Sequence, residues 1–182
     1  RIRHGHLWVF SNEVARADKD IENGEIVTVY DAGGQVLGKG FYNKSSLITV
    51  RLLSSAYNGN FDEYAEEMIN TALKLRKQFY PERNSFRLVF SESDFMPGLI
   101  IDKYNNTYVL QVYCFGMEKN ISSVVNALKN LGAENIFTSN EPYFRKLEGL
   151  PEEDTVFLGE AHKETIDDGS VKYFIDFSKA QK

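Results

Sequence analysis

Cysteine is almost absent from this chain of 182 residues, because Cys114 is the only one. A single thiol cannot form a disulfide within the chain, and it cannot supply the several thiolates of a structural zinc site. No stretch approaches the roughly 18 apolar residues that a membrane-spanning helix needs, and no apolar signal core follows the N-terminal residues. With 42% hydrophobic and 26% charged residues, the composition indicates a globular protein of the reducing cytoplasm, without a metal site or membrane contact.

An excess of basic residues is also missing, since the formal net charge is −5. Residues 1–60 contain 7 basic and 6 acidic residues, whereas residues 61–182 contain 14 basic and 20 acidic residues. Proteins that bind nucleic acid usually carry a basic footprint. We therefore expect any RNA contact to come from the first 60 residues, and we expect it to be weak and salt-dependent.

The chain lacks the glycine-rich loops that hold dinucleotides, S-adenosylmethionine or phosphate. Such a loop stands between a strand and a helix, but Gly33-Gly34 and Gly38–Gly40 lie between or within expected strands. The acidic residues Glu92, Asp94 and Asp102 have no base or nucleophile nearby in the sequence, so we interpret Glu92 and Asp94 as a polar turn in which Asp94 holds loop amides. We predict neither catalytic nor cofactor-binding residues in this chain.

The first part of the chain alternates short β-rich segments with turns. Residues 25–31, 35–42 and 47–53 are expected strands, and small strands this close together favour a compact barrel over residues 1–57. Apolar residues then recur at helical spacing over residues 61–73, with Asn60 as the expected cap and Pro81 beyond the end. We interpret residues 58–80 as a helical linker between two domains.

The second part, residues 81–178, mixes strands with one main helix. We expect a strand at 86–90, a hairpin of 99–104 with 107–114, a helix at 121–131, a strand at 135–139 and a last hairpin of 165–166 with 171–177. The expected fold class is α+β: a β-barrel followed by a small antiparallel α/β sandwich in the order strand, strand, helix, strand, strand. Residues 179–182 would then begin a further domain.

Several blocks resemble one family, and they occur in the family's order. Residues 4–10 resemble "G-H-P-W-V-F", with Leu7 in place of the usual proline, and residues 23–27, 38–46 and 48–51 resemble the blocks that follow. The family is that of PUA-domain, class I S-adenosylmethionine-dependent RNA methyltransferases, of the bacterial and archaeal 23S ribosomal RNA cytosine-5 type.

The resemblance continues through the second part. Residues 92–104 resemble "E-x-D-G-L-P-G-L-I-V-D-x-Y", with Phe95 in place of the usual glycine, and residues 145–150 resemble "R-x-x-E-G-L". Residues 137–141 lack the arginine of the family's "Y-E-R-x-D", because Ser139 is there. The final residues, 174–182, are similar to the approach to the methyltransferase domain.

The resemblance implies a PUA-like RNA-binding barrel and a parent enzyme that methylates C5 of a cytosine in ribosomal RNA. It also implies that the S-adenosylmethionine site and the catalytic cysteine lie in a domain beyond Lys182, so that this chain is a non-catalytic N-terminal fragment whose partners are RNA and that domain. Two alternatives stay open: a stand-alone PUA-type RNA-binding adaptor, and a protein-interaction module that binds no RNA.

The predicted RNA contacts combine basic, aromatic and glycine-flanking positions of the first part. Arginine and lysine contact phosphates, and aromatic rings stack on unpaired bases. Trp8 is interpreted as a core anchor rather than a stacking platform. The roles of Arg145, Lys146 and Glu148 are left open between bracing the absent domain, touching RNA and forming a local ion pair in a solvated loop. The predicted RNA-binding residues are Arg1, Arg3, His4, His6, Lys39, Tyr42, Lys44 and Arg51.

Overall fold

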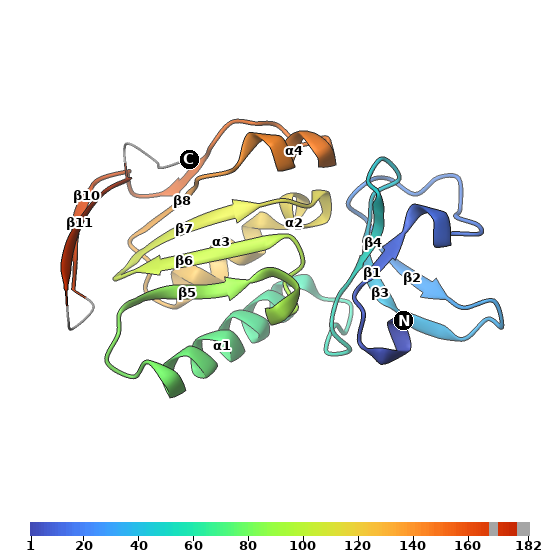
Figure 1. The fold of residues 1–182 in the computed structure, drawn as a ribbon, viewed down its shortest axis with the longest axis horizontal. Coiled ribbons are helices and arrows are strands. Elements are labelled where there is room, and N and C mark those ends of the chain that lie inside the picture. The colour runs from blue at the N-terminus through green and yellow to red at the C-terminus, as the bar shows by residue number, and fades with distance from the viewer. Residues whose placement is uncertain (168–170, 178–182) are drawn as a thin grey trace.

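The computed structural model describes residues 1–167 and 171–177, which form two units side by side (Figure 1). The first unit is an antiparallel four-stranded sheet in the order β1-β4-β3-β2. Its strands are β1 (Trp8–Phe10), β2 (Ile26–Tyr30), β3 (Val36–Tyr42) and β4 (Ile48–Leu52), and single 3-10 turns cover Ile2–His4 and Ser11–Glu13.

The closed barrel expected for residues 1–57 is not found in the described residues, because β1 and β2 remain the two edges of an open sheet. β1 is only three residues long, and the polar segment between Ser11 and Glu25 forms no strand that could join the edges. The strands β3 and β4 approach closely at Gly40, where an added Cβ would lie 2.3 Å from the carbonyl oxygen of Arg51. Only glycine fits there.

The second unit is a five-stranded sheet in the order β5-β6-β7-β8-β9 with helices on one face. The prediction of an antiparallel sheet is wrong at one pair, since β7 and β8 run parallel. Two helices, α2 and α3, connect them as a crossover, and this connection makes neighbouring strands parallel. The elements are β5 (Ser85–Phe90), β6 (Leu99–Tyr104), β7 (Thr107–Val112), α2 (Phe115–Lys119), α3 (Ile121–Asn130), β8 (Asn135–Thr138), α4 (Pro142–Glu148) and β9 (Val156–Leu158), with a 3-10 turn, η3, at Ser91–Asp94.

The helix expected as a linker is α1 (Phe61–Phe79), and it packs as part of the second unit. Its buried face, which includes Tyr64 and Ile69, joins the same apolar core as Leu99 of β6 and Leu128 of α3. The expected cap is confirmed, because the Asn60 side chain accepts hydrogen bonds from two backbone amides of the first helical turn.

Both expected hairpins are present. β6 and β7 pair across Asn105, which has a positive φ of 49°, and β10 (Lys163–Asp167) pairs with β11 (Lys172–Asp176) as a separate two-stranded sheet. The turn between the last two strands is predicted at Asp167–Ser170; Asp167 is the last residue of β10, and the rest of this turn, like the predicted start of a further domain at 179–182, lies outside the described residues. The short helices α2 and α4 were not predicted. No described helix is long and apolar enough to cross a membrane.

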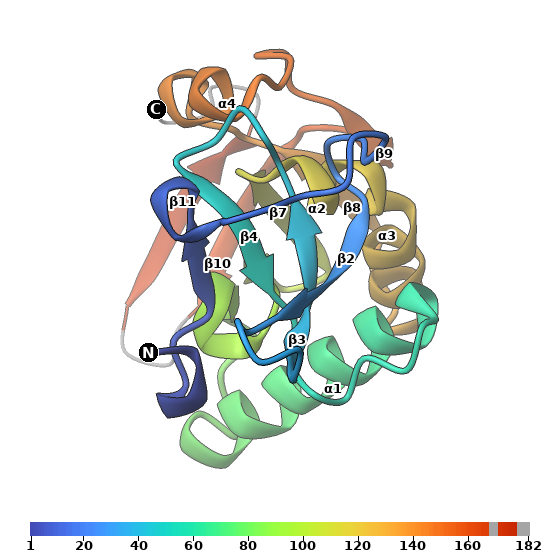
Figure 2. The same ribbon diagram turned by 90° about the vertical axis from the view of Figure 1, so that its right-hand side faces the viewer.

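An apolar contact joins the two units. Phe41 of β3 belongs to the core of the second unit, and its ring lies 5.4 Å from that of Phe61 in α1. Gly116 of α2 covers the same ring so closely that an added Cβ would lie 2.1 Å from it. Figure 2 looks onto the first unit, whose sheet lies in front of the second unit in this view.

Candidate RNA-binding surface and the junction between the units

A groove of about 900 Å³ runs over one face of the first unit's sheet. Its floor is aliphatic and includes Val9, Val27 and Val50. Four basic residues line it: Arg1, Arg3, His4 and Arg16. Four of the eight predicted RNA contacts, Arg1, Arg3, His4 and Tyr42, thus line one groove. Nothing in the sequence pointed to Arg16, because this residue lies in an irregular segment without a motif.

Two arginines of the groove, Arg1 and Arg3, form ion pairs but keep much of their surface in water. The Arg1 guanidinium donates to Glu13 at 2.8 Å and is 48% exposed, and Arg3, which is 62% exposed, pairs with Asp31 and donates to Gln35 at 2.9 Å. Backbone hydrogen bonds from Gln35 and Gly33, together with Arg3, lower the pKa of Asp31 even though burial opposes this. Exposed ion pairs contribute little stability, so a phosphate can compete for both guanidinium groups.

The other predicted contacts are scattered. His6 packs edge-on against Trp8 with ring centroids 6.0 Å apart, and the Lys39 ammonium lies 5.7 Å from the centre of the Tyr57 ring. Lys44 is exposed at the turn between β3 and β4. These three residues do not line the groove of Arg1 and Arg3.

Tyr42 and Arg51 are both largely buried, but in different places. Tyr42 is 9% exposed in the small core of the first unit. The Arg51 side chain is 14% exposed and turned toward the second unit. Tyr42 therefore contributes to the floor of the groove, whereas Arg51 does not line it.

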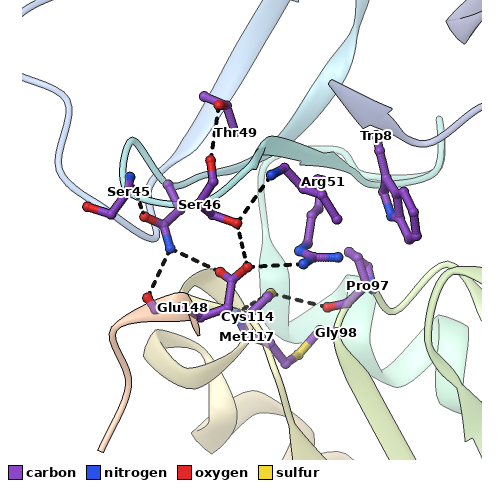
Figure 3. A network of polar contacts seen from close by, with 12 residues as sticks. Trp8, Ser45, Ser46, Thr49, Arg51, Pro97, Gly98, Cys114, Met117 and Glu148 are labelled. Carbon is purple, nitrogen blue, oxygen red and sulfur yellow. Dashed lines mark hydrogen bonds and ion pairs between the residues drawn. The ribbon is translucent and has the colours of Figure 1, made fainter. Parts of the chain in front are cut away.

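Arg51 is instead the centre of a polar network at the junction (Figure 3). Its guanidinium donates to Glu148 of α4 at 3.0 Å and to Glu92 of η3 at 3.2 Å. The indole N–H of Trp8 donates to the same Glu92 oxygen at 2.7 Å. One arginine of the first unit therefore holds two carboxylates of the second.

Glu148 is the most enclosed carboxylate of this network, with 6% of its side chain exposed. Ser46 donates to one carboxylate oxygen at 2.6 Å and Asn43 donates to the other at 3.0 Å (Figure 3). Asn43 also donates to the main-chain oxygen of Glu148 at 3.1 Å. A buried carboxylate requires such partners, and all of these come from the first unit.

The electrostatics of the junction favour a charged Glu92, a charged Arg51 and a neutral Cys114 thiol. Burial opposes the charges of Arg51 and Glu92, but their neighbours outweigh it: acidic groups raise the pKa of Arg51, and hydrogen bonds from Ser91 and Trp8 lower that of Glu92. Burial raises the pKa of the Cys114 thiol to about 12. Its sulfur accepts from the Met117 amide, and the thiol donates to the Pro97 carbonyl.

The remaining candidate residues are structural. Arg145 is 2% exposed and donates to Glu118 at 2.9 Å and to the Val112 carbonyl at 3.0 Å, so it does not belong to a solvated loop. Glu148 is buried as well, whereas Lys146 is exposed. The polar-turn interpretation is confirmed for Asp94, which accepts from the Phe90 amide at 2.6 Å. Among the described residues, no group of His, Cys, Asp or Glu could hold a metal ion.

The sequence blocks that carry the family resemblance meet at this junction. Asn43, Ser46 and Arg51 come from the blocks at 38–46 and 48–51, and Glu92 and Glu148 come from those at 92–104 and 145–150. The blocks that resemble the family therefore include the residues of the network, although the chemistry of these residues alone gave no reason to pair them.

A model of the PUA-like domain matches residues 1–55. The chain contains a PUA-like domain. It is 33% identical over 178 residues to a proposed ribosomal RNA large-subunit methyltransferase of Methanocaldococcus jannaschii, covering 97% of this chain and 45% of that protein. It is 31% identical over 186 residues to ribosomal RNA large-subunit methyltransferase I of Alteromonas mediterranea, covering 100% and 47%.

Solved structures show the same fold. A proposed SAM-dependent methyltransferase from Streptococcus mutans matches the PUA-like domain and the second unit together, with a TM-score of 0.75 and 16% identity over 95% of this chain and 44% of that one. A proposed methyltransferase in complex with SAH matches with the same TM-score at 14% identity, over 95% and 44%. The chain spans about half the length of the curated relatives it matches.

Proposed function

We propose that this chain is the RNA-recognition and connecting part of an S-adenosylmethionine-dependent methyltransferase that modifies C5 of a cytosine in ribosomal RNA. The observation that carries the proposal is the sequence match, which extends over 97% to 100% of the chain with relatives named for ribosomal RNA methylation. The same alignments cover less than half of those relatives. In this proposal the methyl donor and the reacting cytosine bind in the other half.

The paired glycines of the first unit are not placed as a loop that holds S-adenosylmethionine would require. Gly33 and Gly34 lie in the turn between β2 and β3, and Gly38 and Gly40 lie within β3, so none stands between a strand and a helix. Cys114 is also unsuited to attack a base, because a buried thiol with a pKa of about 12 is protonated at neutral pH. We therefore assign recognition and positioning to this chain, and no chemical step.

RNA would bind along the groove of the PUA-like domain. Arg1, Arg3 and Arg16 would donate to phosphate oxygens, with His4 beside them on the same rim. The aliphatic floor suits a sugar or the face of a base better than it suits a phosphate. Lys44 would extend the contact toward the second unit. Tyr42 stays in the proposed set as part of the groove floor, and Arg51, which holds Glu92 and Glu148 at the junction, no longer belongs to it.

The junction would fix the orientation of the bound RNA relative to the rest of the enzyme. Arg51, Glu92 and Glu148 bind the PUA-like domain to the second unit in one orientation, and Phe41 packs into the shared core. An RNA held by the PUA-like domain would thus be held at a fixed angle to whatever follows the second unit.

The test compares this chain with the complete product of its gene. Both are incubated with labelled S-adenosylmethionine and unmodified ribosomal RNA, and we expect label transfer by the longer form alone. Arg3→Ala in the longer form should weaken RNA binding and reduce the slope of log affinity against log salt by about one. Lys129→Ala, an exposed site on α3, should change neither. A longer form that never transfers label, beside a fragment that binds RNA in a salt-dependent way, would favour the adaptor instead.

A further inference from the structure

One face of the five-stranded sheet carries no helix in the described part of the chain (Figure 1). Leu99 and Ile101 of β6 and Leu110 of β7 point into the core under α1 and α3. Side chains alternate along a strand, so Ile100 and Gln111, which are paired in register, face the other way. The face that contains them is called here the open face.

Large apolar side chains are exposed on the open face and beside it. Phe90, opposite Ile100 at the end of β5, is 47% exposed. On α4, Tyr143, Phe144 and Leu147 are 64%, 51% and 58% exposed. The Phe144 ring lies 5.5 Å from that of Tyr113, which follows β7, and a hollow of about 260 Å³ separates this pair from Arg51 and Glu148. Exposed apolar patches of this kind mark contact surfaces.

The charges around the patch favour a protein rather than RNA. Lys146 is an exposed basic residue of α4, whereas the acidic residues Glu152 and Glu153, which follow the helix, are also exposed. Arg87 on the open face is already held by both carboxylate oxygens of Asp102, at 2.8 and 2.9 Å. A polyphosphate chain would meet little free positive charge here.

The end of the described chain lies on this same face. Phe177 packs with ring centroids 5.5 Å from Tyr104 and 5.6 Å from Phe137. Tyr104 lies on the open face, because it is four residues from Ile100 along β6 and side chains at even spacing share a face. Phe137 follows Ile136, which points into the core, so Phe137 faces the other way. A chain that continues from here starts on the side of the exposed patch.

We propose that the open face and the exposed side of α4 form the docking surface for the remaining part of the full-length methyltransferase. This inference rests on the proposed function, in which relatives about twice as long as this chain carry a further domain. That domain would cover Phe90, Tyr143, Phe144 and Leu147, and it would be placed next to the Arg51–Glu148 pair. The PUA-like domain and the following domain would then both contact the second unit through α4.

The test measures how accessible α4 is in the short and the complete chains. Leu147→Cys and, separately, Tyr143→Cys introduce a thiol on the patch, and the native Cys114 is buried and stays unreactive. Maleimide labelling is followed at each site by peptide mass spectrometry. Val36→Cys, at a 61% exposed position at the start of β3, is the matched control. We expect labelling at 147 and 143 to be about tenfold slower in the complete chain, with equal rates at 36.

Three results would overturn the proposal: equal rates at 147 and 143 in both lengths, protection that appears in the short chain as its concentration rises, or protection that requires ribosomal RNA. The second result would assign the face to another copy of this chain, and the third to RNA. Methyl transfer is measured on the same Val36→Cys preparation. Methyl transfer without protection of positions 147 and 143 would contradict the docking proposal alone. Protection of these positions without methyl transfer would contradict the proposed function alone.

Discussion

Arg51 and Glu148 are separated by 97 positions in the sequence, yet their guanidinium and carboxylate groups lie 3.0 Å apart. The pair links β4 of the PUA-like domain to the last turn of α4, and only 14% and 6% of the two side chains are exposed. A buried pair of this kind adds little over an apolar contact, but the loss of one partner leaves a charge without compensation. The orientation of the two units therefore depends on both residues.

Replacing Arg51 with methionine should destabilise the protein by about 3 to 5 kcal/mol, because Glu148 and Glu92 would lose their shared cation in a largely buried site. Urea unfolding at neutral pH measures the change. Lys44→Met removes a charge from an exposed site in the same part of the chain and should cost under about 0.5 kcal/mol. A loss for Arg51→Met as small as that of Lys44→Met would show that the junction does not need the ion pair.

Glu92 should make part of the stability depend on acid pH. Its folded-state pKa is lower than the ordinary 4.5, since hydrogen bonds from Ser91 and Trp8 outweigh burial. A lowered carboxyl pKa contributes stability that is fully present above pH 4.5 and is lost as the pH falls through the folded value. Glu92→Gln keeps an oxygen for the Trp8 indole, so its unfolding free energy, measured from pH 7 to pH 3, should fall less steeply than that of the native protein. Parallel curves would contradict this assignment.

Local rules predicted the local structure of this chain. Asn60 caps α1, and Asn105 takes the positive φ of the β6–β7 turn, because both features depend on a few neighbouring residues. The parallel pairing of β8, the packing of α1 into the second unit and the open sheet depend on contacts between distant segments. The same holds for Arg51, a basic residue of the first part of the chain that we predicted to bind RNA, because its partners Glu92 and Glu148 belong to distant segments.

Gly116→Ala should weaken the apolar junction. The added methyl group would lie 2.1 Å from the Phe41 ring. Alanine is more stable than glycine in a helix by roughly 1 kcal/mol, but overpacking outweighs this gain, so we expect a net loss of about 1 to 3 kcal/mol in the free energy of unfolding. Urea unfolding of the variant measures the cost, and Gly33→Ala, whose methyl group would meet only the Asp31 side chain at 3.3 Å, is the control.

A second substitution separates the clash from any other effect of Gly116→Ala. Phe41→Leu makes room at the same point, so the double variant should lose less stability than the two single losses added together. Additive losses would mean that the Phe41 ring can move aside, and that the contact between α2 and β3 is not tight.

Phe95 occupies a backbone position that suits glycine, since its φ is 57°. The left-handed conformation costs a residue with a Cβ about 1 kcal/mol or more. Replacing Phe95 with glycine or with alanine removes the same ring, which is 43% exposed, so their difference isolates the backbone term. Phe95→Gly should therefore be more stable than Phe95→Ala by about 1 kcal/mol in urea unfolding.

At Phe90, a β5 residue of similar exposure without a positive φ, the order should reverse, because glycine weakens a strand. If alanine were the better residue at both positions, the turn would have to relax into another conformation, and the substitution of the family's glycine would carry no strain.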